Sequence, residues 1–287
     1  DCSGKNISSL KGIECFTALT SLQCYGNQLT ALDVSRNTAL TELCCESNQL
    51  TTLDVSKNTA LKNLRCSTNQ LTTLDVSKNT ALTELSCANN QLTVLIGSKN
   101  TALSFLCCSD NQLATLDVGN YSALRTLWCQ RNQFTALDVS ENTLLEELEC
   151  GDNRLTALDV SKNMELIELE CRTNQLTTLD VSKNTALTYL HCESNQLTTL
   201  DVSRNTALTT LSCWGNQLTA LDVSKNTALK EWSCEKNTYD ITLNANRSYD
   251  LSKLPGSFDV SKAKSWNGCT IQGSVIKVNA GVNEVSY

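Results

Sequence analysis

Cysteine offers the most reactive side chain in this sequence, and its spacing is regular. The chain of 287 residues contains sixteen cysteines, and eleven of them recur at a constant interval of 21 residues. Thiols can form disulfides, ligate zinc or attack as nucleophiles, depending on their surroundings. The periodic set is Cys24, Cys45, Cys66, Cys87, Cys108, Cys129, Cys150, Cys171, Cys192, Cys213 and Cys234.

This constant interval places the eleven side chains in one straight column of a repeating fold. Side chains that point in parallel do not favour the roughly 90° dihedral angle of a disulfide. A straight column also cannot supply the tetrahedral ligand set of a zinc site. Because cysteine packs well as a small buried residue, we predict a ladder of reduced, buried thiols. Cys2 is expected to be a twelfth member in an irregular first unit.

Four cysteines lie outside this ladder. Cys15 and Cys269 belong to the end segments, whereas Cys44 and Cys107 each precede a ladder cysteine and fall on the outward side of the expected strand. A reactive thiol is one interpretation of these two positions. The other, which the sequence favours, is drift of the repeat onto a neutral small residue.

Four glutamates form a second group that could do chemistry. Glu147, Glu149, Glu168 and Glu170 occupy outward positions of two successive units, which predicts a two-by-two block on adjacent strands. Like charges that face each other across strands destabilise a sheet and raise carboxyl pKa values. Aromatic and histidine side chains surround the block: Phe105, Trp128, Tyr189, His191 and, further along, Trp214.

We predict that these nine residues form a ligand-binding patch, because outward aromatics beside unbalanced charge are typical of binding surfaces. A basic peptide segment or an amino-sugar would neutralise the carboxylates. The alternative is that Arg172 and solvent screen the block and that the aromatics are there by chance. A Ca²⁺ site is a further alternative, although it requires about six to eight oxygen ligands and a curved loop.

Catalysis is not predicted. His191 is the only histidine, and its expected strand neighbours, Glu170 and Ser212, do not form a triad with it. A pair of glutamates could hydrolyse glycosides, but an open sheet offers no cleft that excludes water. We therefore predict a protein that is not an enzyme and that needs no cofactor and no metal.

An internal repeat must position these side chains. Leucines recur every 21 residues from Leu19 to Leu229, and the consensus unit is L-T-x-L-x-C-x-x-N-Q-L-T-x-L-D-V-S-K-N-T-A. The alternation around Leu43 and Cys45 predicts a short strand. One unit cannot bury its own apolar side chains, so units must stack into a solenoid with a parallel sheet. The remaining half lacks helical periodicity and is expected to return as a 3-10 turn or an extended segment.

Two asparagine columns follow the same period. One runs from Asn27 to Asn237 after the strand, and the other runs from Asn37 to Asn226, interrupted only at Tyr121. An amide both donates and accepts hydrogen bonds, so such columns can satisfy backbone groups that each turn would otherwise bury unpaired. We predict that both columns are structural.

The period also divides the chain into three parts. Residues 1–18 are predicted to be an irregular N-terminal repeat or cap, residues 19–238 the repeat array, and residues 239–287 a β-rich C-terminal cap. In the last part, apolar alternation predicts strands at 241–243 and 269–271, and a turn at Gly273 predicts a hairpin. Residues expected to pack on the last unit are Leu251, Leu254, Phe258 and Trp266. The strand-like end of the sequence indicates that the natural protein continues.

The run L-x-x-L-x-C-x-x-N-x-L is a leucine-rich repeat with cysteine in place of a leucine. With the 21-residue unit and the D-V-S-x-N-T return, residues 19–238 resemble the bacterial internalins, of the internalin J type. The resemblance implies a leucine-rich-repeat solenoid with its parallel sheet on the concave face. It further implies a secreted or wall-anchored bacterial protein that binds host or neighbouring-cell molecules.

Bacterial effector ligases with a similar repeat carry L-P-x-L-P on the return side. The only proline here is Pro255, outside the array, so we do not expect the chain to belong to that class. Neither a signal peptide nor a wall-anchor motif is present, so the expected extracellular or cell-surface location depends on the resemblance alone.

Composition limits the classes of partner that the chain is expected to bind. The net charge of −7 argues against nucleic acid or an anionic membrane as the main partner. No stretch approaches the roughly 20 apolar residues of a membrane helix. We predict a monomeric extracellular recognition or adhesion module that binds a protein or glycan through the concave sheet. The alternative function is a structural spacer, a stalk that presents another domain at the bacterial surface.

Overall fold

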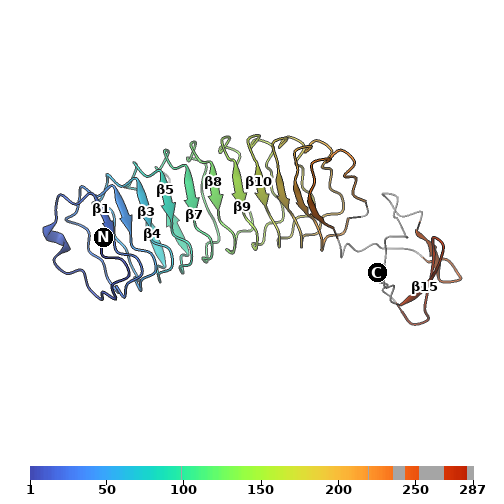
Figure 1. Ribbon diagram of the computed structural model, residues 1–287, viewed down its shortest axis with the longest axis horizontal. Coiled ribbons are helices and arrows are strands. Elements are labelled where there is room, and N and C mark those ends of the chain that lie inside the picture. The colour runs from blue at the N-terminus through green and yellow to red at the C-terminus, as the bar shows by residue number, and fades with distance from the viewer. Residues whose placement is uncertain (98, 219, 235–242, 252–267, 283–287) are drawn as a thin grey trace.

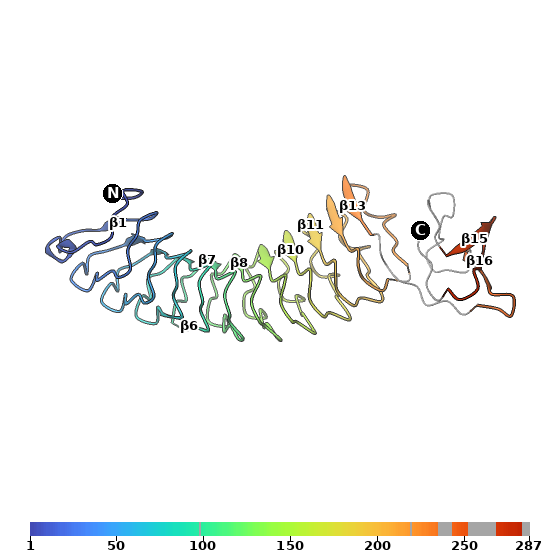
Figure 2. The same cartoon turned by 90° about the horizontal axis from the view of Figure 1, so that it is seen from below.

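The structure, a computed structural model, describes residues 1–97, 99–218, 220–234, 243–251 and 268–282. Its main part is a solenoid in which the 21-residue units follow one another as coils of a curved rod (Figure 1). Each of the paired strands in these coils is three residues long, and together they form an eleven-stranded parallel sheet. This sheet lies on the inner side of the curve (Figure 2). The predicted leucine-rich-repeat solenoid is confirmed.

Neighbouring strands of this sheet pair at offsets of one unit, so that equivalent positions form rows across it. Leu43, for example, pairs with Leu64. In spatial order the strands are β1 (Ser21–Gln23), β2 (Glu42–Cys44), β3 (Asn63–Arg65), β5 (Glu84–Ser86), β7 (Phe105–Cys107), β8 (Thr126–Trp128), β9 (Glu147–Glu149), β10 (Glu168–Glu170), β11 (Tyr189–His191), β12 (Thr210–Ser212) and β13 (Glu231–Ser233).

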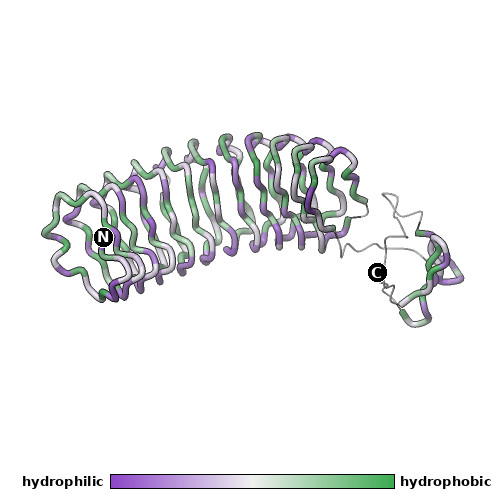
Figure 3. The backbone as a smooth tube through the Cα atoms, viewed as in Figure 1, coloured by the Kyte–Doolittle hydropathy of each residue, from purple (hydrophilic) through white to green (hydrophobic). Residues whose placement is uncertain are grey.

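In the sheet from β1 to β12 the middle residue of each strand enters the core and its two neighbours point outward, as the alternation of a strand requires; Trp232, the middle residue of β13, is exposed. Leu43 and Leu64 are fully buried, whereas Glu42 and Arg65 are partly or largely exposed. The same alternation repeats in each coil, and Figure 3 shows hydrophilic segments succeeding one another along the lower edge of the array. One continuous apolar core therefore runs along the rod.

The cysteine column belongs to this core. All ladder cysteines from Cys24 to Cys213 are 0% exposed, and the chain's cysteines are free thiols. Burial raises the pKa of Cys66 to about 12, because a thiolate loses its hydration in an apolar interior. The predicted cysteine ladder is confirmed.

The first asparagine column joins each unit to the one before it. The Nδ2 group of Asn48 donates to the carbonyl of Cys45 in its own unit (3.1 Å) and to that of Cys24 in the preceding unit (3.0 Å). Its Oδ1 accepts from the amide of Leu29, also in the preceding unit (3.0 Å). An unpaired buried backbone group costs about 1–3 kcal/mol, so the predicted structural role is confirmed. Asn237 lies outside the described residues.

The second column works in a similar way on the opposite side of the coil. Asn58 Nδ2 donates to the carbonyls of Val34 (3.0 Å) and Asn37 (2.9 Å), both in the preceding unit. These asparagines are almost fully buried, and their Oδ1 atoms have no hydrogen-bond partner within the described residues.

The return half of each unit is extended and ends in turns. Two short stretches pair in parallel as β4 (Thr73–Asp75) and β6 (Val94–Ile96). Two successive turns then close the unit, with Asn58 N–H donating to Val55 O (2.9 Å) and Leu61 N–H to Asn58 O (3.1 Å). Within the described coils of the array the return half contains no 3-10 helix; η1 (Ile13–Cys15) lies before the first strand.

The N-terminal segment follows the first strand without forming one. Cys2 N–H donates to Gln23 O (2.9 Å), and Gly4 N–H donates to Tyr25 O (2.9 Å). Asn27 Oδ1 accepts from the amide of Ile7 (3.0 Å) as Asn48 does from Leu29. These are the bonds of an incomplete unit, and they support the proposal that residues 1–18 cap the array.

The C-terminal segment forms a separate antiparallel sheet of β14 (Ser248–Asp250), β16 (Val275–Val278) and β15 (Cys269–Gln272). The predicted hairpin at Gly273 is confirmed by the pairing of β15 with β16. Leu251 packs with this sheet in its own small apolar cluster. Ile241, Leu254, Phe258 and Trp266 lie outside the described residues. Leu243, the described residue of the strand predicted at 241–243, is not in a strand. Strand β14 was not predicted.

Two departures from the consensus compensate each other inside the core. Gly97 stands where other units have valine, and Tyr121, in the next unit, stands where they have asparagine. The Tyr121 side chain is buried, and a Cβ atom on Gly97 would lie 2.6 Å from its hydroxyl oxygen. The missing side chain of one unit therefore makes room for the phenol of the next.

This pair predicts a reciprocal effect on stability. Gly97→Val should destabilise the rod by about 1–3 kcal/mol, because overpacking displaces Tyr121, and Tyr121→Asn alone should destabilise it by leaving a cavity. The double variant restores the consensus valine and asparagine, so its loss should be clearly smaller than the sum of the two. Denaturant unfolding of the four proteins measures this coupling; additive losses would show that the two sites are independent.

Candidate functional site

The predicted site lies on the outward rows of β7 to β11, on the concave side of the rod (Figure 2). The pairing of β9 with β10 places Glu147 opposite Glu168 and Glu149 opposite Glu170. The four carboxylates therefore form the expected block. Its position follows from the period alone, because a 21-residue offset corresponds to one step across the sheet.

Burial and the neighbouring charges of the block both act on Glu149. Partial burial, together with the neighbouring carboxylates of Glu170, Glu147 and Glu168, raises the pKa of Glu149 above its ordinary value. Burial disfavours the charged form, and nearby negative charges disfavour it further. In the described residues its side-chain hydrogen bond comes from the neutral amide of Gln130 (2.7 Å).

Arg172 compensates one corner of the block. Its Nε lies 2.7 Å from Glu170 Oε1, and its Nη2 lies 3.5 Å from Asp152 Oδ2. The screening that the alternative interpretation required is thus present at Glu170. It is divided between two carboxylates, and Arg172 forms no ion pair with Glu147, Glu149 or Glu168 in the described part of the structure.

One pair of rings lies on each side of the carboxylates. On one side, Phe105 and Trp128 pack edge to face with centroids 5.2 Å apart, and Trp128 is directly opposite Glu149. On the other side, Tyr189 and His191 are stacked at 4.1 Å, and they lie opposite Glu168 and Glu170.

The Tyr189–His191 pair is further fixed by a hydrogen bond of 3.0 Å between the tyrosine hydroxyl and His191 Nδ1. Trp214 is not part of this arrangement, since it follows β12, one unit beyond His191, and is half-buried. The structure therefore brings together eight of the nine predicted residues and leaves Trp214 at the margin.

Glu193 is a residue of this surface that the sequence analysis missed. It occupies the position after the ladder cysteine that Arg172 and Trp214 hold in their own units. It is 6% exposed, its Oε1 lies 3.7 Å from His191 Nδ1, and its Oε2 has no hydrogen-bond partner in the described residues. A complete reading of that row would have placed a fifth acidic side chain at the block.

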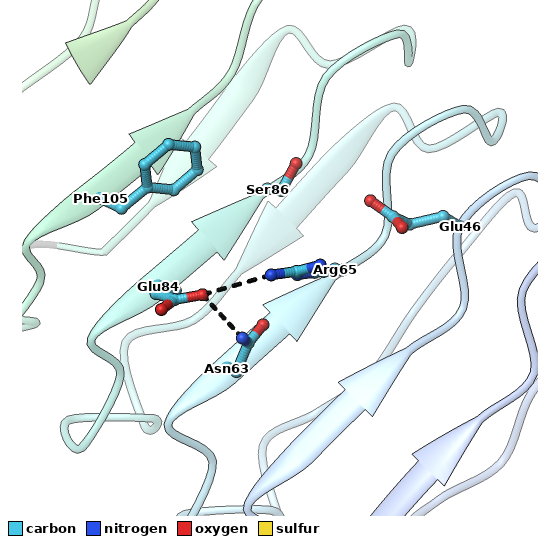
Figure 4. Close-up of a pocket in the computed structure, with 6 residues that line it drawn as sticks. All are labelled: Glu46, Asn63, Arg65, Glu84, Ser86 and Phe105. Carbon is cyan, nitrogen blue, oxygen red and sulfur yellow. Dashed lines mark hydrogen bonds and ion pairs between the residues drawn. The ribbon is translucent and has the colours of Figure 1, made fainter. Parts of the chain in front are cut away.

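A second feature of the concave face was also missed. Towards the N-terminus, β3, β5 and β7 surround a hollow of about 430 Å³ lined by Glu46, Asn63, Arg65, Glu84, Ser86 and Phe105 (Figure 4). Of these residues only Phe105 belongs to the predicted patch. The signal in the sequence was weak, because the lining mixes both charge signs.

The two cysteines in the outward row are buried. Cys44 and Cys107 are 6% and 7% exposed. Burial and the carboxylate of Glu46 raise the pKa of Cys44 to about 11, and its Sγ lies 3.5 Å from Glu46 Oε2. Both features oppose a reactive thiolate.

A metal centre finds no support here. Among the described residues, no three histidine, cysteine, aspartate or glutamate side chains converge as a metal-binding group. No helix in the described part of the chain is long and apolar enough to cross a membrane.

Comparison with known proteins gives matches at the level of structure. No protein-family profile and no curated protein sequence matches the chain. The fold is similar to the functional domain of InlJ from Listeria monocytogenes, which includes a cysteine ladder, with 45% identity and a TM-score of 0.82. That match covers 86% of this chain and 55% of the other, so the chain spans little more than half of that structure.

An internalin, InlF, from Listeria monocytogenes is 25% identical with a TM-score of 0.76, over 82% of this chain and 72% of that one. The plant peptide hormone receptor RGFR1, solved in complex with RGF2, has a TM-score of 0.72. The match covers 80% of this chain and 42% of the receptor at 22% identity, and it shows the shared fold alone.

The buried thiols predict a simple pattern of reactivity. In the native protein, a disulfide reagent such as Ellman's should modify the exposed Cys15 readily and leave the fully buried ladder cysteines, together with Cys44, unmodified. Unfolding in denaturant should release the protected thiols. Mass spectrometry of peptides after native labelling identifies the modified positions; rapid labelling of Cys44 would contradict its assignment as a covered, protonated thiol.

The raised pKa of Glu149 predicts a pH-dependent stability. Since the folded chain holds this proton more tightly than the unfolded chain, the contribution of Glu149 to stability is fully present below the ordinary glutamate pKa. It is lost as the pH rises through the folded-state value. Glu149→Gln should therefore raise the denaturation midpoint at about pH 7, and this gain should vanish near pH 4.

Glu231→Gln is the matched control, because Glu231 is exposed and lies opposite the uncharged Thr210. Urea titrations at both pH values give the comparison. Equal midpoints for wild type and Glu149→Gln at neutral pH would show that the block carries no electrostatic strain.

Proposed function

The chain carries an internalin-type leucine-rich-repeat array, and on that premise we propose that it is a non-catalytic recognition module whose concave sheet binds a protein. The observation that carries the proposal is the block of four carboxylates on β9 and β10, set between two pairs of packed rings. The structural framework does not need these side chains, since the core is complete without them.

The chemistry of the block selects a basic segment of the partner. The formal charge of Glu147, Glu149, Glu168 and Glu170 exceeds what the single cation Arg172 can compensate. A lysine or arginine of the partner would pair with Glu149, whose side-chain bond here comes only from a neutral amide within the described residues. The same cation could lie against the ring of Trp128, which is directly opposite Glu149.

The rings suit the anchoring role that aromatic side chains have in protein interfaces. Such anchors are effective when they are held in place before binding, because less conformational entropy is then lost. Trp128 is held by Phe105, and Tyr189 by its stacking and hydrogen bond with His191. The solved complex of a plant receptor of this fold with RGF2 adds support for recognition by such a solenoid.

The site residues fit binding better than catalysis. Among the described residues, His191 is hydrogen-bonded to a tyrosine, and neither a serine nor a cysteine is bonded to it. The glutamates stand on an open sheet rather than in an enclosed cleft. The likeness to the internalins further supports an extracellular or bacterial cell-surface location and a host or neighbouring-cell partner, with the chain acting as a monomer.

The experiment that tests this function uses a peptide-display library of random sequences, selected on the immobilised full chain. We expect enriched peptides to contain lysine or arginine, and their binding to weaken with rising salt. The double charge reversal Glu149→Lys with Glu170→Lys should reduce their affinity at least tenfold, which corresponds to about 1.4 kcal/mol.

Glu141→Lys with Glu165→Lys is the control. It makes the same change of net charge, but at exposed positions of the return side, so binding should stay as in wild type. If no sequence is enriched, or if the first variant binds like the second, the concave block is not a binding site. The spacer function would then account better for the rod.

A further inference from the structure

The hollow on β3, β5 and β7 is separate from the acidic block and has different chemistry. Its nearest strand, β7, is separated from β9 by β8, and Phe105 on β7 belongs both to the hollow and to the predicted patch. The volume of the hollow, about 430 Å³, is within the usual range of small-molecule sites, roughly 300–1,000 Å³. Figure 4 shows Arg65 reaching into it between Glu84 and Glu46, with the Phe105 ring standing at the opposite side.

One carboxylate oxygen of Glu84 holds two of the polar side chains of the hollow in place. Glu84 Oε2 accepts from Asn63 Nδ2 (2.7 Å) and lies 3.5 Å from Arg65 Nη2. Ser86 is fixed by a hydrogen bond of 2.8 Å with Ser67. Because Asn63 and Arg65 converge on a single oxygen of Glu84, the other carboxylate oxygen and most guanidinium N–H groups are left to a ligand.

The charges of the hollow favour a neutral ligand. Arg65 is the one cation in the lining and has a carboxylate on each side, so its charge is already balanced (Figure 4). With two carboxylates and one guanidinium, the lining carries a net formal charge of −1 and repels an anionic ligand. A cation would have to approach these carboxylates beside Arg65, which lies between them (Figure 4). The available groups are instead adjacent donors and acceptors on planar side chains, which match vicinal hydroxyl groups because each hydroxyl both donates and accepts.

The apolar side of the hollow completes this match. The Phe105 ring is partly exposed and is kept upright by its edge-to-face contact with Trp128. The negative face of an aromatic ring attracts polarised C–H groups, which a pyranose presents on one of its faces. We propose that this hollow binds a neutral sugar residue of a glycan, with Arg65 and Glu84 bonding its hydroxyl groups and Phe105 packing against its C–H face.

The site is open on the concave side, so a glycan chain can extend from it in either direction along the sheet. A protein partner that carries such a glycan would be held at two places, by the sugar at the hollow and by a basic segment at the acidic block. Two linked contacts of this kind raise the overall affinity through effective concentration. The sugar site does not depend on the acidic block.

Saturation-transfer NMR on the full chain tests the proposal with four neutral tetrasaccharides as probes: cellotetraose, maltotetraose, mannotetraose and chitotetraose. At least one should bind, and Arg65→Ala should weaken it tenfold or more, because two or more hydrogen bonds to a charged group are lost. Glu84→Gln, which keeps the shape, should weaken it less. Tetragalacturonate, which is anionic, should bind more weakly than the neutral probe.

Each alternative outcome has a defined meaning. Absence of binding by all four neutral probes, an unchanged affinity in Arg65→Ala, or a preference for tetragalacturonate would overturn the proposal. Glu149→Lys with Glu170→Lys should leave sugar binding unchanged while it weakens binding of basic peptides at least tenfold. Arg65→Ala should have the converse effect, so failure at one site is distinguishable from failure at the other.

Discussion

Backbone hydrogen bonding in a dry interior is the constraint on which this structure depends. Every coil turns back on itself within about 21 residues, and each turn directs amide and carbonyl groups towards a core that excludes water. Asn48 and its equivalents satisfy these groups in their own unit and in the preceding one at the same time. The same amide therefore joins each unit to the one before it at the turn that follows the strand.

This constraint gives the two faces of each strand different roles. The inward residue is fixed by packing, whereas the outward residues carry no structural duty and can differ from unit to unit. Rows such as Glu147 and Glu168 then arise by placing similar residues one unit apart. Burial and the neighbouring carboxylates together raise the pKa of Glu149, so this placement disfavours its charged form. Local conflict of this kind on an otherwise consistent scaffold is typical of functional surfaces.

The sequence was sufficient for the fold and for the outline of the site. The coil, the strand, the two asparagine columns and the carboxylate block all follow from a 21-residue offset, because the offset defines one step across the sheet. The features that the sequence did not predict depend on the conformations of long side chains. The division of Arg172 between Glu170 and Asp152, the burial of Glu193 and the hollow beside Arg65 are of this kind. Strand β14 was not predicted because the C-terminal segment has no repeat that would define how its strands pair.

The complementary pair Gly97 and Tyr121 has a consequence for how such a chain finds its native order. Near-identical coils can pair with the wrong neighbour at little energetic penalty, as when one coil is looped out and the next two close the gap. The phenol of Tyr121 fits only against the coil that lacks a side chain at position 97; any other coil would present a valine to it. This complementary fit therefore identifies which two coils are neighbours at this point of the stack.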